Sequence, residues 1–209
     1  METFLTAIIT FAATNVDDIF ILMLFFSEAD ASFRRRHIVF GQYLGFIVLI
    51  LISLLGFFSR FVIPAPWLGL LGIAPIVIGV RKLFTRSLIE EEKIDIGAQA
   101  KQDLQPSSIG SLLNPRAYSV AAVTVANGGD NLGIYTPLFA SSDLPRLVTI
   151  IVIFLVLVAV WCFVGYKLTR QPHVATILSR YSNILVPLVL IGLGVYIFIE
   201  NGTLALLQR

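Results

Sequence analysis

The sequence ANGGDN at residues 126–131 sets two amides and a carboxylate in the middle of an otherwise apolar segment, Ala117–Ala140. A second polar cluster, TNVDDIF at residues 14–20, lies inside another apolar segment, Thr3–Ser27. Asn15 and Asn127 are 112 positions apart, and the same offset takes Asp18 to Asp130 and Pro75 to Pro187. Because Asn-x-x-Asp is rare in apolar helices, the matched clusters predict an internal repeat.

Six segments are long and apolar enough to cross a membrane, since a transmembrane helix needs roughly 20 mainly apolar residues. These segments are Thr3–Ser27, Ile38–Ser59, Trp67–Phe84, Ala117–Ala140, Leu147–Leu168 and Asn183–Leu206. Each copy of the repeat holds three of them, an odd number, so the second copy enters the membrane from the opposite face. The sequence therefore predicts an all-α membrane protein with six transmembrane helices as two inverted three-helix repeats, an arrangement found in many secondary transporters. The predicted divisions are residues 1–84 for the first repeat, 85–115 for a polar cytoplasmic loop and 116–209 for the second repeat.

The composition agrees with a chain embedded in lipid. Of the 209 residues, 57% are hydrophobic and 13% are charged, against about 25% charged in a soluble domain. The mean hydropathy is +0.88. A formal net charge of +2 argues against a nucleic-acid binder, and the single cysteine, Cys162, excludes a disulfide framework and a cysteine-cluster metal site. The lipid bilayer is the expected partner, and no nucleic acid is.

The distribution of lysine and arginine predicts the orientation. With six crossings both termini share one side, and three of the fifteen bases lie there: Arg60, Arg146 and Arg209. The other twelve, Lys82 among them, fall on the opposite side. Since the positive side faces the cytoplasm, we expect a multi-pass inner (plasma) membrane protein with both termini outside the cytoplasm.

Three acidic residues, Asp17, Asp18 and Asp130, lie near the centres of their segments. Each costs about 2.5–3.5 kcal/mol at such a depth on insertion scales. No basic residue is expected at the same depth, so their partners should be protons, water, neutral polar groups or a bound cation. Within each cluster, residues three or four apart share a helix face, whereas Asp17 points about 100° away from Asp18. The predicted metal site consists of Asp18, Asp130, Asp17, Asn15, Asn127 and Asn131.

Carboxylate and amide oxygens are ligands that suit a divalent cation. Gly128 and Gly129 should weaken the fourth segment, and an opened turn there would add backbone carbonyls, as in discontinuous transporter helices. The sequence has no Walker motif, so we expect no direct use of ATP. Inward proton flux could drive export if a carboxylate exchanges a proton for the metal. The prediction is a secondary transporter rather than an enzyme, with the cation as substrate and no permanently bound cofactor.

The chain resembles the cadmium-resistance transporter family, within the broader lysine-exporter superfamily. The stretches that carry the resemblance are Ala13–Asp18, Gly41–Phe46, Leu71–Ile76, Val125–Tyr135 and Pro137–Phe139. The resemblance implies a six-helix inner-membrane exporter of divalent cations that confers cadmium resistance. It also places the family's polar positions on Asp17, Asp18, Asn127, Asp130 and Asn131. Cadmium prefers sulfur ligands, and the chain has one Cys and two Met, so the residues themselves favour a divalent cation without naming one.

Two other functions stay open. An intramembrane aspartyl protease would use Asp18 and Asp130 as its dyad, but Asn127 stands where its Gly-x-Gly-Asp motif has the first glycine. An amino-acid exporter is suggested by the superfamily alone, and the acidic site disfavours a substrate carboxylate that no mid-membrane base would receive. The sequence leaves open which ion is carried, the proton stoichiometry and the oligomeric state, including a homodimer.

Overall fold

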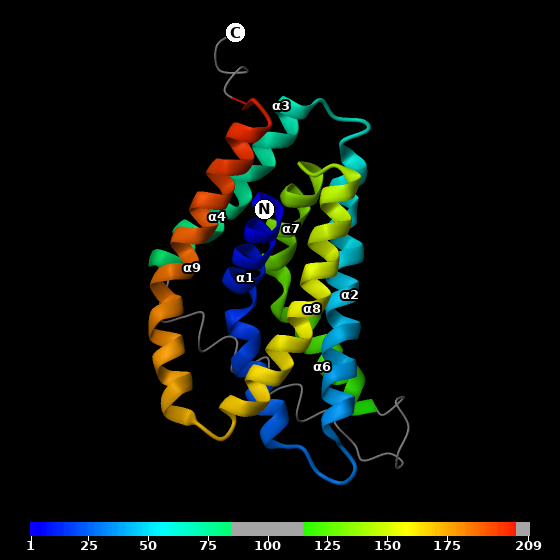
Figure 1. Ribbon diagram of the computed structural model, residues 1–209, viewed down its shortest axis with the longest axis vertical. Coiled ribbons are helices and arrows are strands. Elements are labelled where there is room, and N and C mark those ends of the chain that lie inside the picture. Colours follow the sequence, from blue (N-terminus) through cyan, green and yellow to red (C-terminus); the bar gives the residue numbers. More distant parts are fainter. Residues whose placement is uncertain (85–114, 204–209) are drawn as a thin grey trace.

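The computed structural model describes residues 1–84 and 115–203, and for residues 65 and 172–184 it describes the backbone alone. Within these ranges the chain is helical and has no strand. The helices are α1 (Glu2–Ser27), α2 (Arg35–Ser59), α3 (Ala65–Leu68), the 3-10 helix η1 (Gly69–Gly72), α4 (Ile73–Phe84), α6 (Pro115–Asn127), α7 (Gly129–Ala140), α8 (Leu144–Leu168) and α9 (Pro172–Glu200). Figure 1 shows them as an elongated bundle. Apart from Pro115, the predicted loop 85–115 lies outside the described residues, as does the end of the sixth predicted segment.

Four stretches of the described chain are long and apolar enough to cross a membrane: α1, α2, Pro66–Phe84 and α8. In α9 the part whose side chains are described, Leu185–Glu200, is also an apolar helix but is shorter than these four. The fourth predicted segment is divided at Gly128 into α6, with 13 residues, and α7, with 12 residues. The all-helical prediction is therefore confirmed for the described residues, and the count of six crossings stays a prediction.

One face of α8 is an uninterrupted apolar surface. Val148, Val152, Val156 and Val160 are spaced by four residues and are 42% to 59% exposed. Side chains at this spacing lie one above the other on a helix. A soluble monomer rarely exposes so long an apolar stripe, whereas in a bilayer it is ordinary lipid-facing surface. We call these four valines the α8 lipid face.

Two glycines bring α2 close to α6. A Cβ atom added to Gly41 would lie 2.3 Å from the backbone oxygen of Ala117, and one added to Gly45 would lie 2.7 Å from that of Ala121. Small residues four apart allow such contact between membrane helices. Because Gln42 follows Gly41 directly, this contact presses its side chain against α6.

Replacing Gly41 with alanine should destabilise the bundle by about 2 kcal/mol, because the added methyl group overpacks a tight contact. Gly192→Ala is the matched control, since a Cβ there meets nothing within 4 Å. That change should be neutral or stabilising by up to about 1 kcal/mol through helix propensity. Thermal unfolding of the two purified variants in detergent measures the difference, and equal melting temperatures would contradict this packing.

The third predicted segment, α3 to α4, packs against α9. The backbones of Gly72 and Gly194 approach closely, and a Cβ on Gly79 would lie 2.8 Å from the carbonyl oxygen of Pro187. In Figure 1, α4 ends part-way along the bundle rather than at the end where α1 and α2 are joined. Its last turn carries Arg81 and Lys82. The backbone of these two basic residues therefore lies part-way along the bundle and not at its end.

Candidate metal site in the bundle

The polar cluster of the fourth predicted segment lies where α6 gives way to α7. Gly128 separates the two helices with φ −80° and ψ 15°, at the position that the two consecutive glycines predicted. Its N–H still donates to the Thr124 carbonyl (2.9 Å), and its own carbonyl accepts from the Leu132 N–H (3.2 Å). The helix is therefore interrupted between Asn127 and Asp130. The Gly128 carbonyl, however, already accepts a hydrogen bond from Leu132 and is not an open ligand for a cation.

Asp18 joins three helices. The residue is 2% exposed, and its carboxylate accepts hydrogen bonds from Gln42 Nε2 on α2 (3.0 Å) and from Asn127 Nδ2 on α6 (2.6 Å). Gln42 in turn accepts from the Thr124 hydroxyl (2.7 Å). The polar clusters of the first and fourth predicted segments thus meet inside the bundle.

Asn15 occupies a second polar position, one turn before Asp18. Its Nδ2 donates to the Tyr135 hydroxyl (2.7 Å) and to the Phe11 carbonyl (2.8 Å). Its Oδ1 accepts a long hydrogen bond from Asn131 Nδ2 (3.4 Å), and its backbone carbonyl accepts from Trp161 Nε1 (2.7 Å). Asn15 therefore ties α1 to both α7 and α8.

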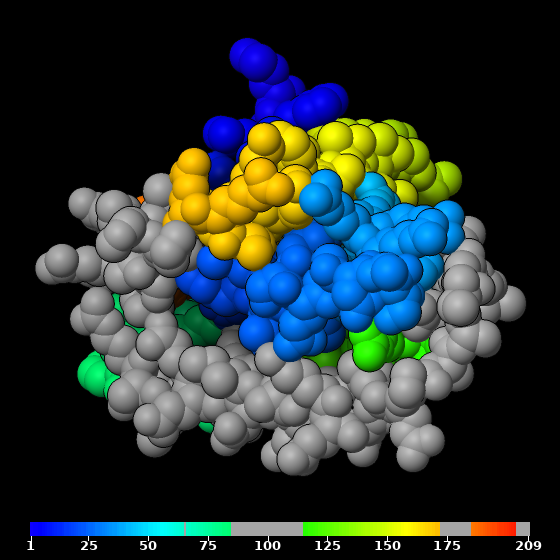
Figure 2. Space-filling model, turned by 90° about the horizontal axis from the view of Figure 1, so that it is seen from below, coloured from blue at the N-terminus to red at the C-terminus, as the bar shows by residue number. Residues whose placement is uncertain are grey.

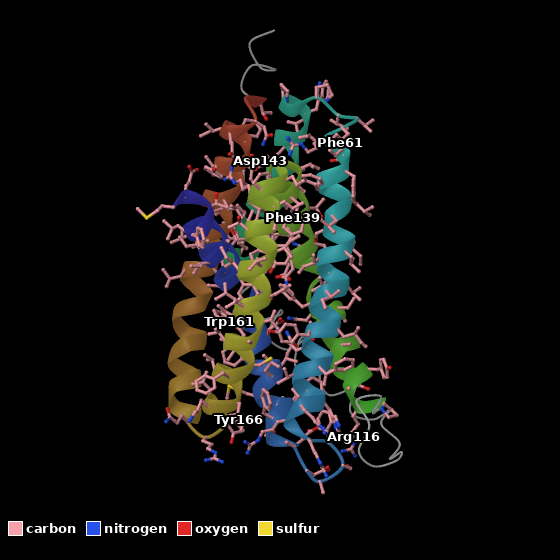
Figure 3. The ribbon with its side chains drawn as sticks, turned by 45° about the vertical axis from the view of Figure 1, so that its right-hand side comes forward. Phe61, Arg116, Phe139, Asp143, Trp161 and Tyr166 are labelled. Carbon is pink, nitrogen blue, oxygen red and sulfur yellow. The ribbon has the colours of Figure 1, made fainter. Side chains whose placement is uncertain are left out.

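An aromatic cluster stands behind Asn15. The rings of Tyr135 and Phe154 have centroids 4.8 Å apart, and Phe11 meets Trp161 edge-on at 5.1 Å. Figure 3 shows Trp161 part-way along α8, between the two ends of the bundle. Since edge-on and offset aromatic pairs pack densely, this cluster closes the polar site on the α8 side.

Two buried amide oxygens accept no hydrogen bond from the described residues: Asn127 Oδ1 and Asn131 Oδ1. The orientation of the Asn127 amide follows from its partner, because an ionised carboxylate only accepts and so must face Nδ2. Native proteins pair nearly all buried polar atoms. Two unsatisfied oxygens beside Asp18 and Asn15 are therefore candidate ligands for a cation.

Lys82 lies between the two remaining acids. Its Nζ is 2.7 Å from Asp130 Oδ2 and 3.5 Å from Asp17 Oδ2. The three side chains are 15%, 17% and 31% exposed, in the order Lys82, Asp130, Asp17. The prediction that no base lies at this depth is wrong, because α4 ends part-way along the bundle and the four-carbon stem of lysine spans the rest.

The six predicted site residues thus form three neighbouring groups. Asp18 bonds to Asn127, Asn15 bonds to Asn131, and Asp17 and Asp130 share Lys82. In the described part of the chain no three His, Cys, Asp or Glu side chains gather closely enough to hold a metal ion. A cation bound here would therefore need amide oxygens as well as carboxylates.

The sequence profile of cadmium resistance transporters matches residues 11–209, which include every residue of this site. The chain belongs to the cadmium resistance transporter family. No curated protein and no solved structure matches the chain. The family assignment confirms the resemblance to cadmium resistance transporters and favours transport over catalysis, and the placement in the lysine-exporter superfamily stays a prediction.

Four polar side chains that bond to the predicted site residues or to one another were not predicted as part of the site: Gln42, Lys82, Thr124 and Tyr135. Thr124 and Tyr135 stand three residues before Asn127 and four after Asn131. This helical spacing is a signal that could have found both. Lys82 carries no such signal, because its place depends on where α4 ends in the bundle.

The contact between Gln42 and Asp18 makes Gln42→Leu a sharp test of the site. Leucine keeps the bulk but removes the donor that orients the carboxylate, and losing such a supporting group typically lowers metal affinity about 10- to 100-fold. Tyr43→Phe is the matched control, because it also removes a hydrogen bond of α2, to the Leu155 carbonyl (2.8 Å), away from Asp18. Calorimetric titration of both purified variants with Cd²⁺ measures the effect, and unchanged affinity in Gln42→Leu would contradict the role of Gln42.

Proposed function

We propose that this chain exports divalent cations, cadmium among them, across the inner membrane and so confers metal resistance. The cation in transit would be held by Asp18, Asp130, Asp17, Asn15, Asn127 and Asn131. One observation carries the proposal: the 2.6 Å hydrogen bond from Asn127 Nδ2 to Asp18 Oδ1, which joins the two acidic motifs. Two buried amide oxygens without partners among the described residues supply further neutral ligands beside it.

The charges of the site support a divalent substrate. Asp17, Asp18 and Asp130 in ionised form, together with the Lys82 ammonium, leave two negative charges. A divalent cation would neutralise this remainder, and charges buried in a low-dielectric interior need such compensation. Oxygen ligands fit manganese or calcium as readily as cadmium. The proposed site therefore favours a divalent charge and does not distinguish strongly between these three metals.

Lys82 would act as a resident counter-ion in the absence of metal. Its ammonium group neutralises part of the Asp17–Asp130 pair at 3.5 and 2.7 Å. A cation that uses these carboxylates would move the ammonium off them but leave it within the site, since the flexible lysine stem lets the group swing aside. Inward proton flux, with a carboxylate exchanging a proton for the metal, is our proposed driving force.

The contacts between helices support two inverted repeats, residues 1–84 and 116–209, and hence six crossings. The main pairs are α1 with α8, α2 with α6 and α7, and α4 with α9. In the two proposed repeats α1 corresponds to α6–α7, α2 corresponds to α8, and α4 corresponds to α9. If each helix is replaced by its counterpart, the contact of α1 with α8 becomes the contact of α6–α7 with α2, and the contact of α4 with α9 stays the same. A pseudo-two-fold axis in the membrane plane predicts this pattern.

The positions of the bases support termini outside the cytoplasm. The α1–α2 connection ends at Arg34, and Arg35 and Arg36 begin α2. This part of the chain lies at the same end of the bundle as the start of α6 and the end of α8 (Figure 1). The other end holds the start of α8, near Arg146. Because basic ends face the cytoplasm, the richer end is the proposed cytoplasmic one.

Expression in a cadmium-sensitive bacterium tests the proposed function. Cells with the full chain should grow at cadmium concentrations that stop cells with an empty vector, and should retain less cadmium, as measured by elemental mass spectrometry of washed cells. Unchanged growth and unchanged cellular cadmium, with the protein present in the membrane fraction, would contradict the proposal.

An amino-acid exporter is the second candidate, and Lys82 is the observation that favours it. A base among the polar groups could receive a substrate carboxylate, which the sequence had argued against. Lys82 is already paired with two acids, so divalent-cation export remains our first proposal. Efflux of radiolabelled lysine from loaded cells, without any change in cadmium content, would reverse this order.

The protease alternative fits the geometry less well. An aspartyl dyad needs two carboxyl groups that share a proton. Asp130 is instead paired with Lys82, and Asp18 accepts from two amides. Because Asp18 and Asp130 have different partners, they are not arranged to share a proton, and this arrangement favours cation transport over proteolysis.

A further inference from the structure

A cavity of about 650 Å³ opens at the end of the bundle where α1 and α2 are joined. Its lining includes four arginines, Arg34, Arg35, Arg36 and Arg170, together with Asp30 and Tyr166. Figure 2 looks onto this end, where the end of α8 (orange) lies beside the α1–α2 connection (blue). Figure 3 places Tyr166 and Arg116 at this end, opposite Phe61 and Asp143. We call this cavity the arginine pocket.

Asp30 does not cancel the charge of the pocket. Its Oδ1 accepts hydrogen bonds from the Ser32 hydroxyl (2.7 Å) and from the N–H groups of Ser32 (2.6 Å) and Phe33 (2.7 Å), and its Oδ2 pairs with Arg116 (3.3 Å). The bond from the Ser32 side chain and the two backbone bonds lower the pKa of Asp30 to about 2. This carboxylate is therefore ionised and committed to folding the α1–α2 connection.

Among the described residues, Arg35 and Arg170 have no acid of their own. In residues 1–84 and 115–203, neither Arg35 nor Arg170 lies within salt-bridge distance of a carboxylate. Both are instead held by Tyr166. The Arg35 guanidinium lies 4.0 Å from the ring centroid, and that of Arg170 lies 5.7 Å from it and donates to the hydroxyl (3.4 Å). A stacked guanidinium keeps its donors free for an anion.

The α8 lipid face leads directly to the pocket. Below Val160 the next exposed residue on that face is Phe163, at 60% exposure, and Tyr166 follows one turn later. The surface thus passes from apolar side chains to a stacked aromatic ring and then to guanidinium groups. A phospholipid has the same order of chemistry along its length, from acyl chain to phosphate.

We propose that the arginine pocket binds a phosphate-bearing anion, supplied as the headgroup of an anionic phospholipid from the adjoining leaflet. The guanidinium groups of Arg35 and Arg170 bind the phosphate oxygens, since the planar guanidinium fork matches phosphate geometry. Basic pockets between transmembrane helices at the cytoplasmic side bind anionic headgroups in this way. The site lies apart from the acidic residues of the bundle, so it is independent of which ion the protein carries.

Native mass spectrometry of the full chain in detergent tests this site, with dioleoyl phosphatidylglycerol, dioleoyl phosphatidylcholine and inorganic phosphate as probes. Phosphatidylglycerol should bind more tightly than phosphatidylcholine. Arg170→Gln should weaken its binding about fivefold and Arg35→Gln with Arg170→Gln about 30-fold, at the usual contribution of a base near an anionic surface. Arg81→Gln, which removes an exposed charge of α4 outside the lining, should change it less than about twofold, because salt screens a distant exposed charge.

Three results would overturn the assignment. Equal weakening in Arg81→Gln and Arg170→Gln would show a general charge effect, and equal binding of the two lipids would show that the anionic headgroup is not recognised. If inorganic phosphate displaces phosphatidylglycerol at low concentration, the phosphate chemistry of the pocket is supported and the lipid is overturned as its source. Elution of each variant at the native volume in size-exclusion chromatography separates loss of binding from loss of fold.

Discussion

Asp18→Asn should abolish metal export while leaving the protein folded. The asparagine has the same shape, and its carbonyl oxygen accepts one of the two amide donors, so the cost is about one buried hydrogen bond, roughly 1–3 kcal/mol. The negative charge that a cation would bind is lost completely. Transport should fall to the background of protein-free vesicles, because the proposed site would then lose its most buried carboxylate, 2% exposed.

The control for this variant removes a carboxylate outside the site. Asp143 caps the start of α8 and accepts from the Arg146 N–H (2.9 Å). Asparagine is an equally good N-cap, so Asp143→Asn should export at the native rate. Circular dichroism and size-exclusion elution establish that both variants are folded. Native export by Asp18→Asn would remove Asp18 from the pathway.

Lys82→Met should produce the largest loss of stability of any single change in the site, about 3 kcal/mol. Removing one partner of a buried ion pair leaves the other charge uncompensated, which typically costs 3–5 kcal/mol. Here two carboxylates, Asp17 and Asp130, lose their shared partner. Arg81→Met is the matched control. Because the side chain of the neighbouring Arg81 is exposed, this change should leave the free energy of unfolding nearly unaltered.

A double-mutant cycle separates this pairing from simple loss of bulk. Adding Asp130→Asn to Lys82→Met removes the carboxylate at 2.7 Å and should recover part of the lost stability. Cadmium should also raise the melting temperature of Lys82→Met more than that of the native protein, since the cation would replace the missing ammonium. Strictly additive effects in the double variant would contradict the pairing.

The meeting of the two acidic motifs could be predicted because helical periodicity and a constant offset both act along the chain. Asn15 and Asp18 share a face at spacing three, and the 112-residue offset pairs them with Asn127 and Asp130. In the structure Asn127 does bond to Asp18. The division at Gly128 was likewise predictable, because two consecutive glycines weaken a helix.

The place of Lys82 could not be predicted from the sequence in this way. Counting residues from the end of an apolar segment assigns Lys82 to the membrane surface, on the assumption that each helix runs the full depth. The depth of α4 is set by how η1 and α4 pack against α9, through Gly72 of η1 and Gly79 of α4, which is a tertiary effect. The role of Gln42 as a donor to Asp18 also depends on the close approach of two helices that are distant in sequence.

Metal flux into proteoliposomes tests divalent-cation transport most directly. The purified chain is reconstituted, and entry of cadmium, zinc, manganese and calcium is followed with an internal dye, with and without a pH gradient, beside vesicles with Asp18→Asn. We predict saturable entry of at least one divalent cation, faster with the gradient and absent in Asp18→Asn. If none of the four ions enters faster than into empty vesicles, or if Asp18→Asn carries them at the native rate, divalent-cation transport through this site is contradicted.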